Sequence, residues 1–149
     1  MSYSDIINED IKKAMLAREK DKLEAIRAIK AAFIVARADK GANSVLEEAE
    51  EVKIIQKLVK QRKDSATIYV EQNRPELAEK EIMEADVIGK YLPAQMSEQE
   101  IASVVKKIIA ESGASGMKDM GKVMGLATKE LSGKADGKVI SMLVKQLLG

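Results

Sequence analysis

The sequence predicts an all-α protein made of two helical domains. Apolar residues recur three and four positions apart along most of the chain, and no useful stretch shows the alternation with period two that a strand requires. Aromatic residues make up only 3% of the 149 residues, so the core must be built from Ile, Leu, Val, Met and Ala, as in helical bundles. We expect an N-terminal helical domain over residues 1–92, with one long central helix, and a C-terminal three-helix bundle over residues 97–149.

The first two helices are predicted from capping residues and from apolar spacing. Ser4 is a suitable N-cap for a helix that ends near residues 19–20, and Asp21 is a suitable N-cap for the second helix. Gly41 predicts the end of the second helix, because glycine tolerates the backbone conformations found there. The apolar positions of these two helices are Ile7, Ile11, Ala14 and Met15, and then Leu23, Ile26, Ile29 and Phe33.

A long central helix is predicted between a capping box and a proline. Ser44-Val-Leu-Glu47 has the capping-box pattern, and neither glycine nor proline follows it before Pro75. Such a helix would be roughly 40 Å long. Pro75 is well tolerated in the first turn of a fourth helix, whose early glutamates complement the helix dipole. The residues that keep the helical period in the central helix are Val52, Ile55, Val59, Arg62, Ala66 and Tyr69.

The C-terminal part is predicted to hold three shorter helices. Pro93 interrupts the period and Ser97-Glu-Gln-Glu100 is a second capping box, so we place the domain boundary at residues 92–96. The fifth helix should end at Gly113, and the seventh should begin at or near Asp136. The predicted buried face of the sixth helix consists of Met117, Met120, Met124 and Leu131, with Ala127.

Composition excludes several kinds of chemistry. Without Cys or His, the chain has no thiol nucleophile, disulfide, Cys/His zinc site or Ser–His relay, and we expect no metal and no cofactor. No targeting signal is visible, and the longest apolar run, residues 31–36, is too short to span a membrane. We therefore expect a cytoplasmic protein with no membrane partner. Because the net charge is only +1, any contact with nucleic acid must come from a local basic patch.

Glycines and lysines near the C-terminus predict a surface that binds an anion. On the sixth helix they form one stripe roughly opposite the methionines, and in the next turn they flank a helix start whose free N–H groups attract phosphate. A solvated lysine face, glycines that serve only as helix stops, and a close helix crossing at Gly121 are the alternatives. The predicted nucleic-acid-binding residues are Lys118, Lys122, Gly125, Lys129, Gly133, Lys134, Gly137 and Lys138.

One apparent phosphate-binding loop is rejected. Residues 116–122 fit the first seven positions of that motif, but the eighth is Val123, which lacks the hydroxyl that holds magnesium. No buried strand precedes the segment, so we do not expect nucleotide hydrolysis.

A second basic patch is predicted on the long central helix. Glu50, Glu51 and Asp64 are near enough in sequence to pair with some of its charges, and the acidic fourth helix could also dock against it, so a solvated face is the alternative to a binding surface. No aromatic residue interleaves with the cations, so backbone contacts would dominate over base stacking. The patch consists of Lys53, Lys57, Lys60, Arg62 and Lys63.

Four motifs together resemble the small stand-alone bacterial YqeY proteins of the GatB/YqeY family. The C-terminal part is also similar to the tail domain of the GatB subunit of the glutamine-dependent aspartyl/glutamyl-tRNA amidotransferase, a domain associated with tRNA binding. The resemblance implies an all-helical, two-part fold. Lys134 stands where the family often has arginine, and residues 126–131 lack a proline that is often seen there. The motifs are Lys60-Gln-Arg-Lys-Asp-Ser65, Tyr91-Leu-Pro-Ala-Gln95, Asp119-Met-Gly-Lys-Val-Met-Gly125 and Gly133-Lys-Ala-Asp-Gly-Lys138.

The functional expectation is a non-catalytic tRNA-binding accessory protein linked to tRNA aminoacylation or transamidation in translation. One alternative is a component of a glutamine-dependent carbon–nitrogen ligase, which the resemblance implies but for which no catalytic constellation is visible. The other alternative is a protein-interaction module for a tRNA synthetase or an amidotransferase. The expected partners are therefore tRNA and these enzymes, while the sequence leaves the oligomeric state open.

Overall fold

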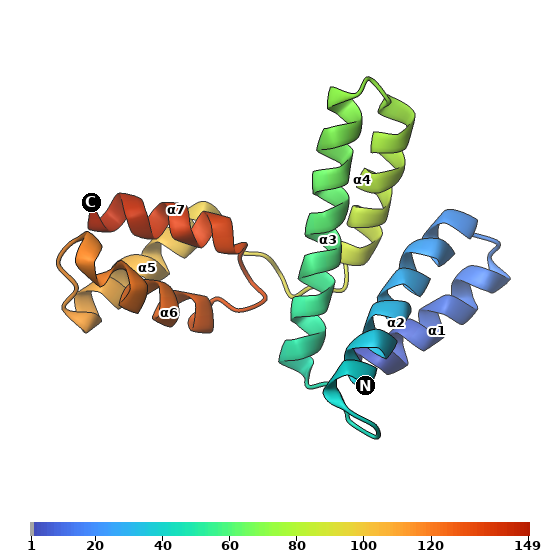
Figure 1. Ribbon diagram of the computed structural model, residues 1–149, viewed down its shortest axis with the longest axis horizontal. Helices are drawn as coiled ribbons and strands as arrows, with labels where there is room; N and C mark the ends of the chain where they lie inside the picture. The colour runs from blue at the N-terminus through green and yellow to red at the C-terminus, as the bar shows by residue number, and fades with distance from the viewer. Residues whose placement is uncertain (1) are drawn as a thin grey trace. The chain divides into compact units, whose positions relative to one another are not determined.

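The computed structural model describes residues 2–149, which form seven α-helices, one short 3₁₀ helix and no strand. The predicted all-α class is confirmed. Contacts within the chain separate two compact units, Met1–Leu92 and Pro93–Gly149, and each unit has its own core (Figure 1). None of the helices formed by residues 2–149 combines the length and the apolarity needed to cross a membrane.

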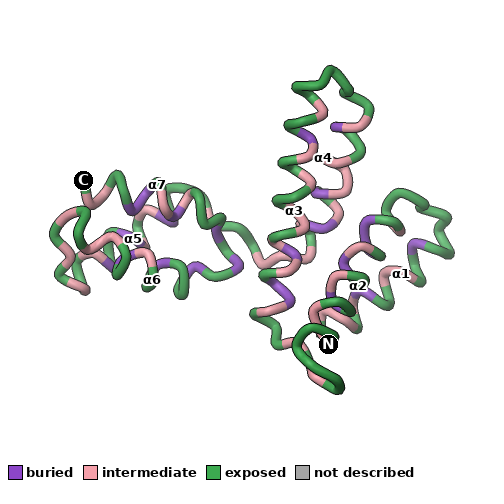
Figure 2. Tube along the Cα trace, in the orientation of Figure 1, coloured by how far each residue is buried: buried purple, intermediate pink, exposed green. Residues whose placement is uncertain are grey.

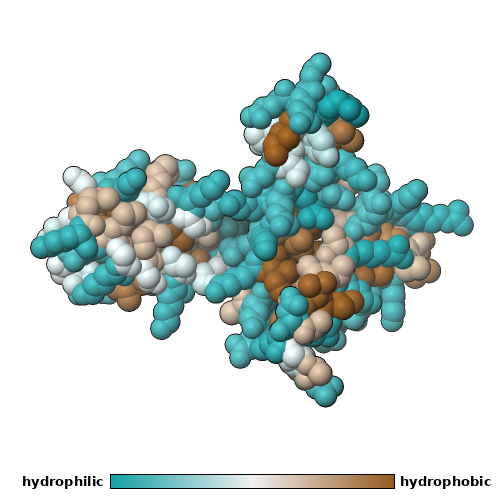
Figure 3. Space-filling view, viewed as in Figure 1, coloured by the Kyte–Doolittle hydropathy of each residue, from teal (hydrophilic) through white to brown (hydrophobic). Residues whose placement is uncertain are grey.

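The N-terminal unit contains four helices: α1 (Tyr3–Leu16), α2 (Lys20–Lys40), α3 (Glu48–Glu71) and α4 (Pro75–Gly89). Helices α3 and α4 lie side by side, as do α1 and α2, and α2 also packs against α3 and α4 (Figure 1). The facing sides of the helices are buried (Figure 2). The largest fully buried side chain is Phe33. Apolar atoms also reach the surface of this unit between hydrophilic ones (Figure 3). Ile34 and Val35, for example, are 51% and 60% exposed.

The first two helices begin and end at other residues than predicted. Ser2, not Ser4, caps α1: its Oγ accepts a hydrogen bond from the Asp5 N–H at 3.2 Å, and the Asp5 carboxylate accepts one from the Ser2 N–H. Helix α1 ends at Leu16 because Arg18 adopts a left-handed backbone conformation with φ of 58°. Helix α2 begins at Lys20 without a side-chain cap, so Asp21 lies inside its first turn.

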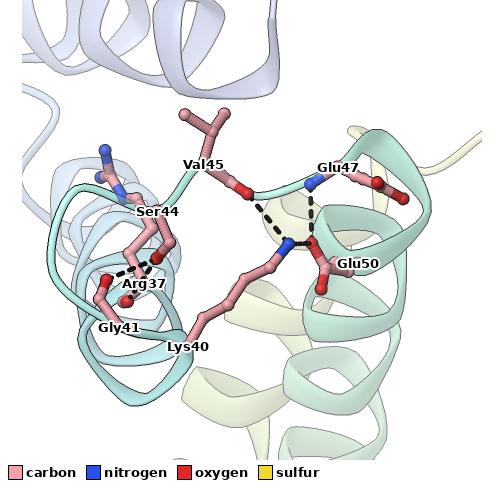
Figure 4. Close-up of polar contacts among 7 residues, drawn as sticks. All are labelled: Arg37, Lys40, Gly41, Ser44, Val45, Glu47 and Glu50. Carbon is pink, nitrogen blue, oxygen red and sulfur yellow. Dashed lines mark hydrogen bonds and ion pairs between the residues drawn. The ribbon is translucent and has the colours of Figure 1, made fainter.

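Ser44 ends α2 and does not cap α3, contrary to the prediction (Figure 4). Its Oγ donates to the carbonyl oxygens of Arg37, at 2.8 Å, and Gly41, at 2.7 Å. The hydroxyl therefore adds a second hydrogen bond to two carbonyl oxygens that also accept from backbone N–H groups, those of Gly41 and Ser44. The predicted end of α2 at Gly41 is confirmed.

The true capping box of α3 lies three residues later and uses two glutamates (Figure 4). The N–H of Glu47 donates to Oε2 of Glu50 at 2.7 Å, and Nζ of Lys40 contacts the same oxygen at 2.9 Å. Lys40 also donates to the carbonyl of Val45, and its contact lowers the pKa of Glu50. Helix α3 spans 24 residues and ends at Glu71, so it is shorter than predicted.

The C-terminal unit contains α5 (Glu98–Ser112), the 3₁₀ helix (Met117–Asp119), α6 (Met120–Glu130) and α7 (Gly137–Leu148). Three predicted boundaries are confirmed. Ser97 caps α5 by accepting from the Glu100 N–H, Gly113 ends it with φ of 70°, and Asp136 caps α7. The fully buried centre of this unit comprises Val105, Val123, Ala127, Leu131, Ile140 and Val144.

The predicted buried face of α6 is confirmed at Ala127 and Leu131 and differs at the methionines. Val123, which was not among the predicted residues, is fully buried, whereas Met117 is 46% exposed and Met120 and Met124 are only half-buried. The prediction assumed one continuous helix from residue 117. Residues 117–119 instead form a 3₁₀ turn, which has about 3.0 residues per turn and so breaks the helical phase before α6 begins.

Candidate nucleic-acid interface

Exposed lysines without an ionic partner are the main feature of the predicted site. The five ion pairs found among residues 2–149 all lie in the N-terminal unit. The C-terminal unit carries eight lysines and six acidic residues, so its net charge is +2 while the whole chain has +1. These lysines are therefore free to meet an anion in solution. The five predicted lysines, all exposed, are Lys118, Lys122, Lys129, Lys134 and Lys138.

An open groove of about 550 Å³ between α5 and α6 brings two of these lysines together. Lys122 and Lys129 line it, and Nζ of Lys122 lies 3.4 Å from the carbonyl oxygen of Ser112, which belongs to the last turn of α5. Lys122 therefore stabilises the end of α5, where a cation complements the helix dipole. The other residues that line the groove are Ile108, Glu111, Ser112, Leu126 and Glu130, so its two lysines are balanced by two glutamates.

The glycines of α6 face open space. A Cβ atom added at Gly121 or Gly125 would meet no atom within 4 Å, and the same holds at Gly137. A close helix crossing at Gly121 within this chain is thereby excluded. Each glycine inside a helix costs about 1 kcal/mol relative to alanine, and here no packing within the chain compensates for it. The backbone of α6 beside Lys122 and Lys129 is thus open to approach from outside.

Gly133 is buried and does not contribute to an exposed surface. It adopts φ of 79°, which favours glycine, in the turn after α6. Its carbonyl oxygen accepts a hydrogen bond from Nε2 of Gln95 at 2.9 Å, and the carbonyl of Lys134 accepts one from the N–H of Met96. The motif at residues 91–95 thus holds this turn, while the side chain of Lys134 remains exposed.

The start of α7 is already occupied by a carboxylate of the chain. Oδ1 of Asp136 accepts a hydrogen bond from the N–H of Lys138 at 2.9 Å. An anionic cap at this position takes up one of the N–H groups that the sequence suggested for phosphate. Any anion contact here must therefore come mainly from the side chains of Lys134 and Lys138.

The second basic patch separates into an inward-facing arginine and four exposed lysines. Nε of Arg62 lies 3.4 Å from Oε2 of Glu84 on α4, and its Nη1 donates to the carbonyl of Leu58. The two charged side chains are only 18% and 14% exposed, so Arg62 belongs to the interface between α3 and α4. Arg62 was predicted to belong to the basic patch, although its spacing from Val59 and Ala66 was a signal for burial. The exposed lysines are Lys53, Lys57, Lys60 and Lys63.

Two polar features of the N-terminal unit were not predicted. The Glu51 side chain is buried, with the Ser4 Oγ 3.4 Å from its Oε2, and removal from water raises the pKa of its carboxyl group. The hydroxyl of Tyr91 donates to Asp10, which lies 81 residues earlier. Neither pattern has a local sequence signal, because the partners come from distant helices. No group of three or more acidic side chains within residues 2–149 is placed to hold a metal ion.

Comparisons with known proteins match almost the whole chain. Residues 4–148 match the family model described as Yqey-like protein. Altered inheritance of mitochondria protein 41, mitochondrial, from Pyrenophora tritici-repentis is 31% identical over 147 residues, which cover 96% of this chain and 79% of the relative. The proteins of the same name from Clavispora lusitaniae and Saccharomyces cerevisiae (strain YJM789) are 35% and 33% identical; the matches cover 71% and 89% of this chain, and 62% and 70% of those proteins. These fungal relatives have mitochondrial names and lend no support to the expected bacterial origin or cytoplasmic location.

Proposed function

Because the chain belongs to the Yqey-like protein family, we propose that it is a non-catalytic RNA-binding protein that acts on tRNA or on the enzymes that charge tRNA. The observation that carries this proposal is the set of exposed lysines in the C-terminal unit, where no ion pair forms among residues 93–149. Lysines that lack carboxylate partners suit the phosphate backbone of a nucleic acid, which positions a protein without reading base sequence.

The individual residues differ in what they offer to RNA. Lys118, Lys134 and Lys138 are exposed and make no side-chain hydrogen bond in the described chain, so they are the proposed phosphate contacts. Lys122 is held by the end of α5, and Lys129 shares a groove with glutamates, so both should contribute less. Gly125 presents open backbone that an RNA strand could approach closely.

We propose that the protein acts in translation, in the compartment that contains the tRNA it binds. The cytoplasm is that compartment in our proposal. The mitochondrial names of the relatives make the mitochondrion the competing location. Fractionation of the source cells with detection of the native protein separates the two.

Salt-dependent binding of a tRNA pool to the full chain tests the proposal. The affinity for tRNA falls as salt rises, so a plot of log affinity against log salt has a negative slope. Changing Lys118, Lys134 and Lys138 together to Gln should make this slope less steep by about 2 to 3, because each lost phosphate contact removes about 0.7 to 0.9 from its magnitude. The matched control changes three other exposed lysines of the same unit, Lys106, Lys107 and Lys145, to Gln and should leave most of the slope. Equal effects of both variants would contradict the assigned surface.

The non-catalytic part of the proposal has its own test. A component of a glutamine-dependent carbon–nitrogen ligase is the alternative, and the same preparation can be incubated with glutamine. Release of ammonia by the chain alone would contradict a purely binding role.

A further inference from the structure

The middle of α3 is the most strongly basic segment that the structure exposes. Residues 53–63 contain four lysines, one arginine and no acidic residue, although the whole chain has a net charge of only +1. Arg62 faces inward, so every exposed position of this segment except Gln61 is a lysine. We call Lys53, Lys57, Lys60 and Lys63 the α3 lysine row.

Two of the carboxylates that could neutralise the α3 lysine row make their hydrogen bonds or ion pairs with other groups. Glu84 of α4 contacts Arg62, and Glu50 accepts hydrogen bonds from Lys40 and from the Glu47 N–H. No side chain of the row takes part in an ion pair or a hydrogen bond with any residue from 2 to 149. Asp64, one residue beyond the row, is the exposed acid at its end.

We propose that the α3 lysine row is a second and separate polyanion-binding face, which takes the phosphodiester backbone of a nucleic acid irrespective of base sequence. The proposal rests on the proposed function for its partner class, RNA, but uses different residues on a different unit. The row extends over about 15 Å of helix, at about 1.5 Å per residue. At roughly 3.4 Å of axis per phosphate on one strand of a duplex, that length covers about four phosphates.

The surroundings of the row favour a nucleic acid over an anionic membrane. A helix that lies on a membrane inserts an apolar face into the lipid. The apolar face of α3, which includes Val52, Ile55 and Ala66, is instead buried inside the N-terminal unit. No large apolar residue is exposed between positions 53 and 63. No aromatic residue is present in the segment either, so base stacking has no platform there and phosphate contacts remain.

The test compares three variants of the full chain. The row variant changes Lys53, Lys57, Lys60 and Lys63 to Gln, which keeps a similar helix propensity. The charge control changes four other exposed lysines of the same unit that form no ion pair, namely Lys12, Lys13, Lys30 and Lys90, to Gln. The third is the Lys118/Lys134/Lys138 variant described above. Circular dichroism confirms folding, and the probes are a tRNA pool, a mixed-sequence DNA duplex and phosphatidylserine vesicles over a range of salt concentrations.

For tRNA and DNA alike, the row variant should reduce the magnitude of the slope of log affinity against log salt by about 3. Its affinity at about 0.1 M salt should fall about tenfold or more. The charge control should retain most of the slope and most of the affinity. Row-dependent binding of tRNA and DNA with equal affinity would support the inference while removing the tRNA preference from the proposed function. Loss in the Lys118/Lys134/Lys138 variant alone would overturn the inference and keep the proposed site. Equal behaviour of the row variant and the charge control, or binding of the wild type to vesicles but to neither nucleic acid, would also overturn it.

Discussion

The hydroxyl of Tyr91 donates a 2.5 Å hydrogen bond to Oδ2 of Asp10, and so ties the segment after α4 to α1 across 81 residues. The short distance is typical of a hydroxyl that donates to a carboxylate. Burial raises the pKa of Tyr91 above its ordinary value, and the hydrogen bond and charge of Asp10 raise it further. The hydroxyl therefore stays protonated and remains a donor throughout the ordinary pH range.

Changing Tyr91 to Phe should lower the free energy of unfolding by about 1 to 2 kcal/mol, because a partly buried carboxylate loses its donor. Urea denaturation followed by circular dichroism measures the change. Tyr69→Phe is the matched control, because the Tyr69 side chain is also half-buried but its hydroxyl makes no hydrogen bond in the described chain. Similar losses in both variants would show that the hydroxyl bond to Asp10 contributes nothing specific.

Changing Glu51 to Gln should stabilise the fold near neutral pH and not at low pH. Burial raises the pKa of Glu51 above its ordinary value of 4.5, so the folded chain holds this proton more tightly than the unfolded chain does. The carboxyl group therefore costs no stability below about pH 4.5, and its cost grows as the pH rises through the raised folded pKa. Thermal melts at about pH 7.5 and about pH 4 should show the difference in melting temperature only at the higher pH. A difference of equal size at both would contradict a charge effect.

The pair of Arg62 and Glu84 should matter for stability and not for binding of nucleic acid. Arg62→Met leaves Glu84 largely buried without its partner and should cost about 2 to 4 kcal/mol. The double variant Arg62→Met, Glu84→Leu should recover most of this loss, because an apolar pair of similar volume replaces two charges. Denaturation of the wild type, the single variant and the double variant measures the loss and its recovery. Unchanged tRNA affinity of the folded double variant is expected, and a large fall would return Arg62 to the binding surface.

Alanine at Gly121 or Gly125 should stabilise α6 by roughly 0.5 to 1 kcal/mol at each position, because both glycines lie within a helix and an added methyl group meets no atom. Thermal denaturation measures the gain. The same variants probe function, since a methyl group at Gly125 would obstruct close approach of RNA while leaving every lysine in place. Higher stability with weaker tRNA binding is the expected result for Gly125→Ala, and unchanged binding would remove Gly125 from the site.

The helices were predictable because their signals are local. Ser97, Gly113 and Asp136 each mark a boundary through contacts with residues at most a few positions away. Where a local pattern competes with the packing of the chain, the sequence alone misleads. Ser44 begins a capping-box pattern and Glu47 is not a usual N-cap residue, yet the fold uses Ser44 for the end of α2 and Glu47 for the start of α3. The exposure of Met117 was not predicted because the 3₁₀ turn that contains it has no strong sequence signal.

The candidate site was predictable only as a set of exposed cations. Sequence spacing indicated which lysines share a helix face, and their exposure agrees with that. What the sequence could not reveal is which groups the fold uses for itself. Lys122 binds the end of α5, Asp136 caps α7, and Arg62 turns toward Glu84, and each of these contacts depends on where a neighbouring backbone or helix lies. The binding role of the remaining lysines stays a prediction.

The two ends of the motif Tyr91-Leu-Pro-Ala-Gln95 form hydrogen bonds in different units. Tyr91 bonds to Asp10 within the N-terminal unit, and the Gln95 amide bonds to Gly133 within the C-terminal unit. Each hydrophobic core likewise draws its residues from one unit alone. Cleavage of the chain between residues 92 and 94 would therefore leave each half with its own hydrogen bond from this motif and its own hydrophobic core. In engineering terms we expect the chain to be modular, with halves that can be expressed, exchanged or duplicated as separate building blocks.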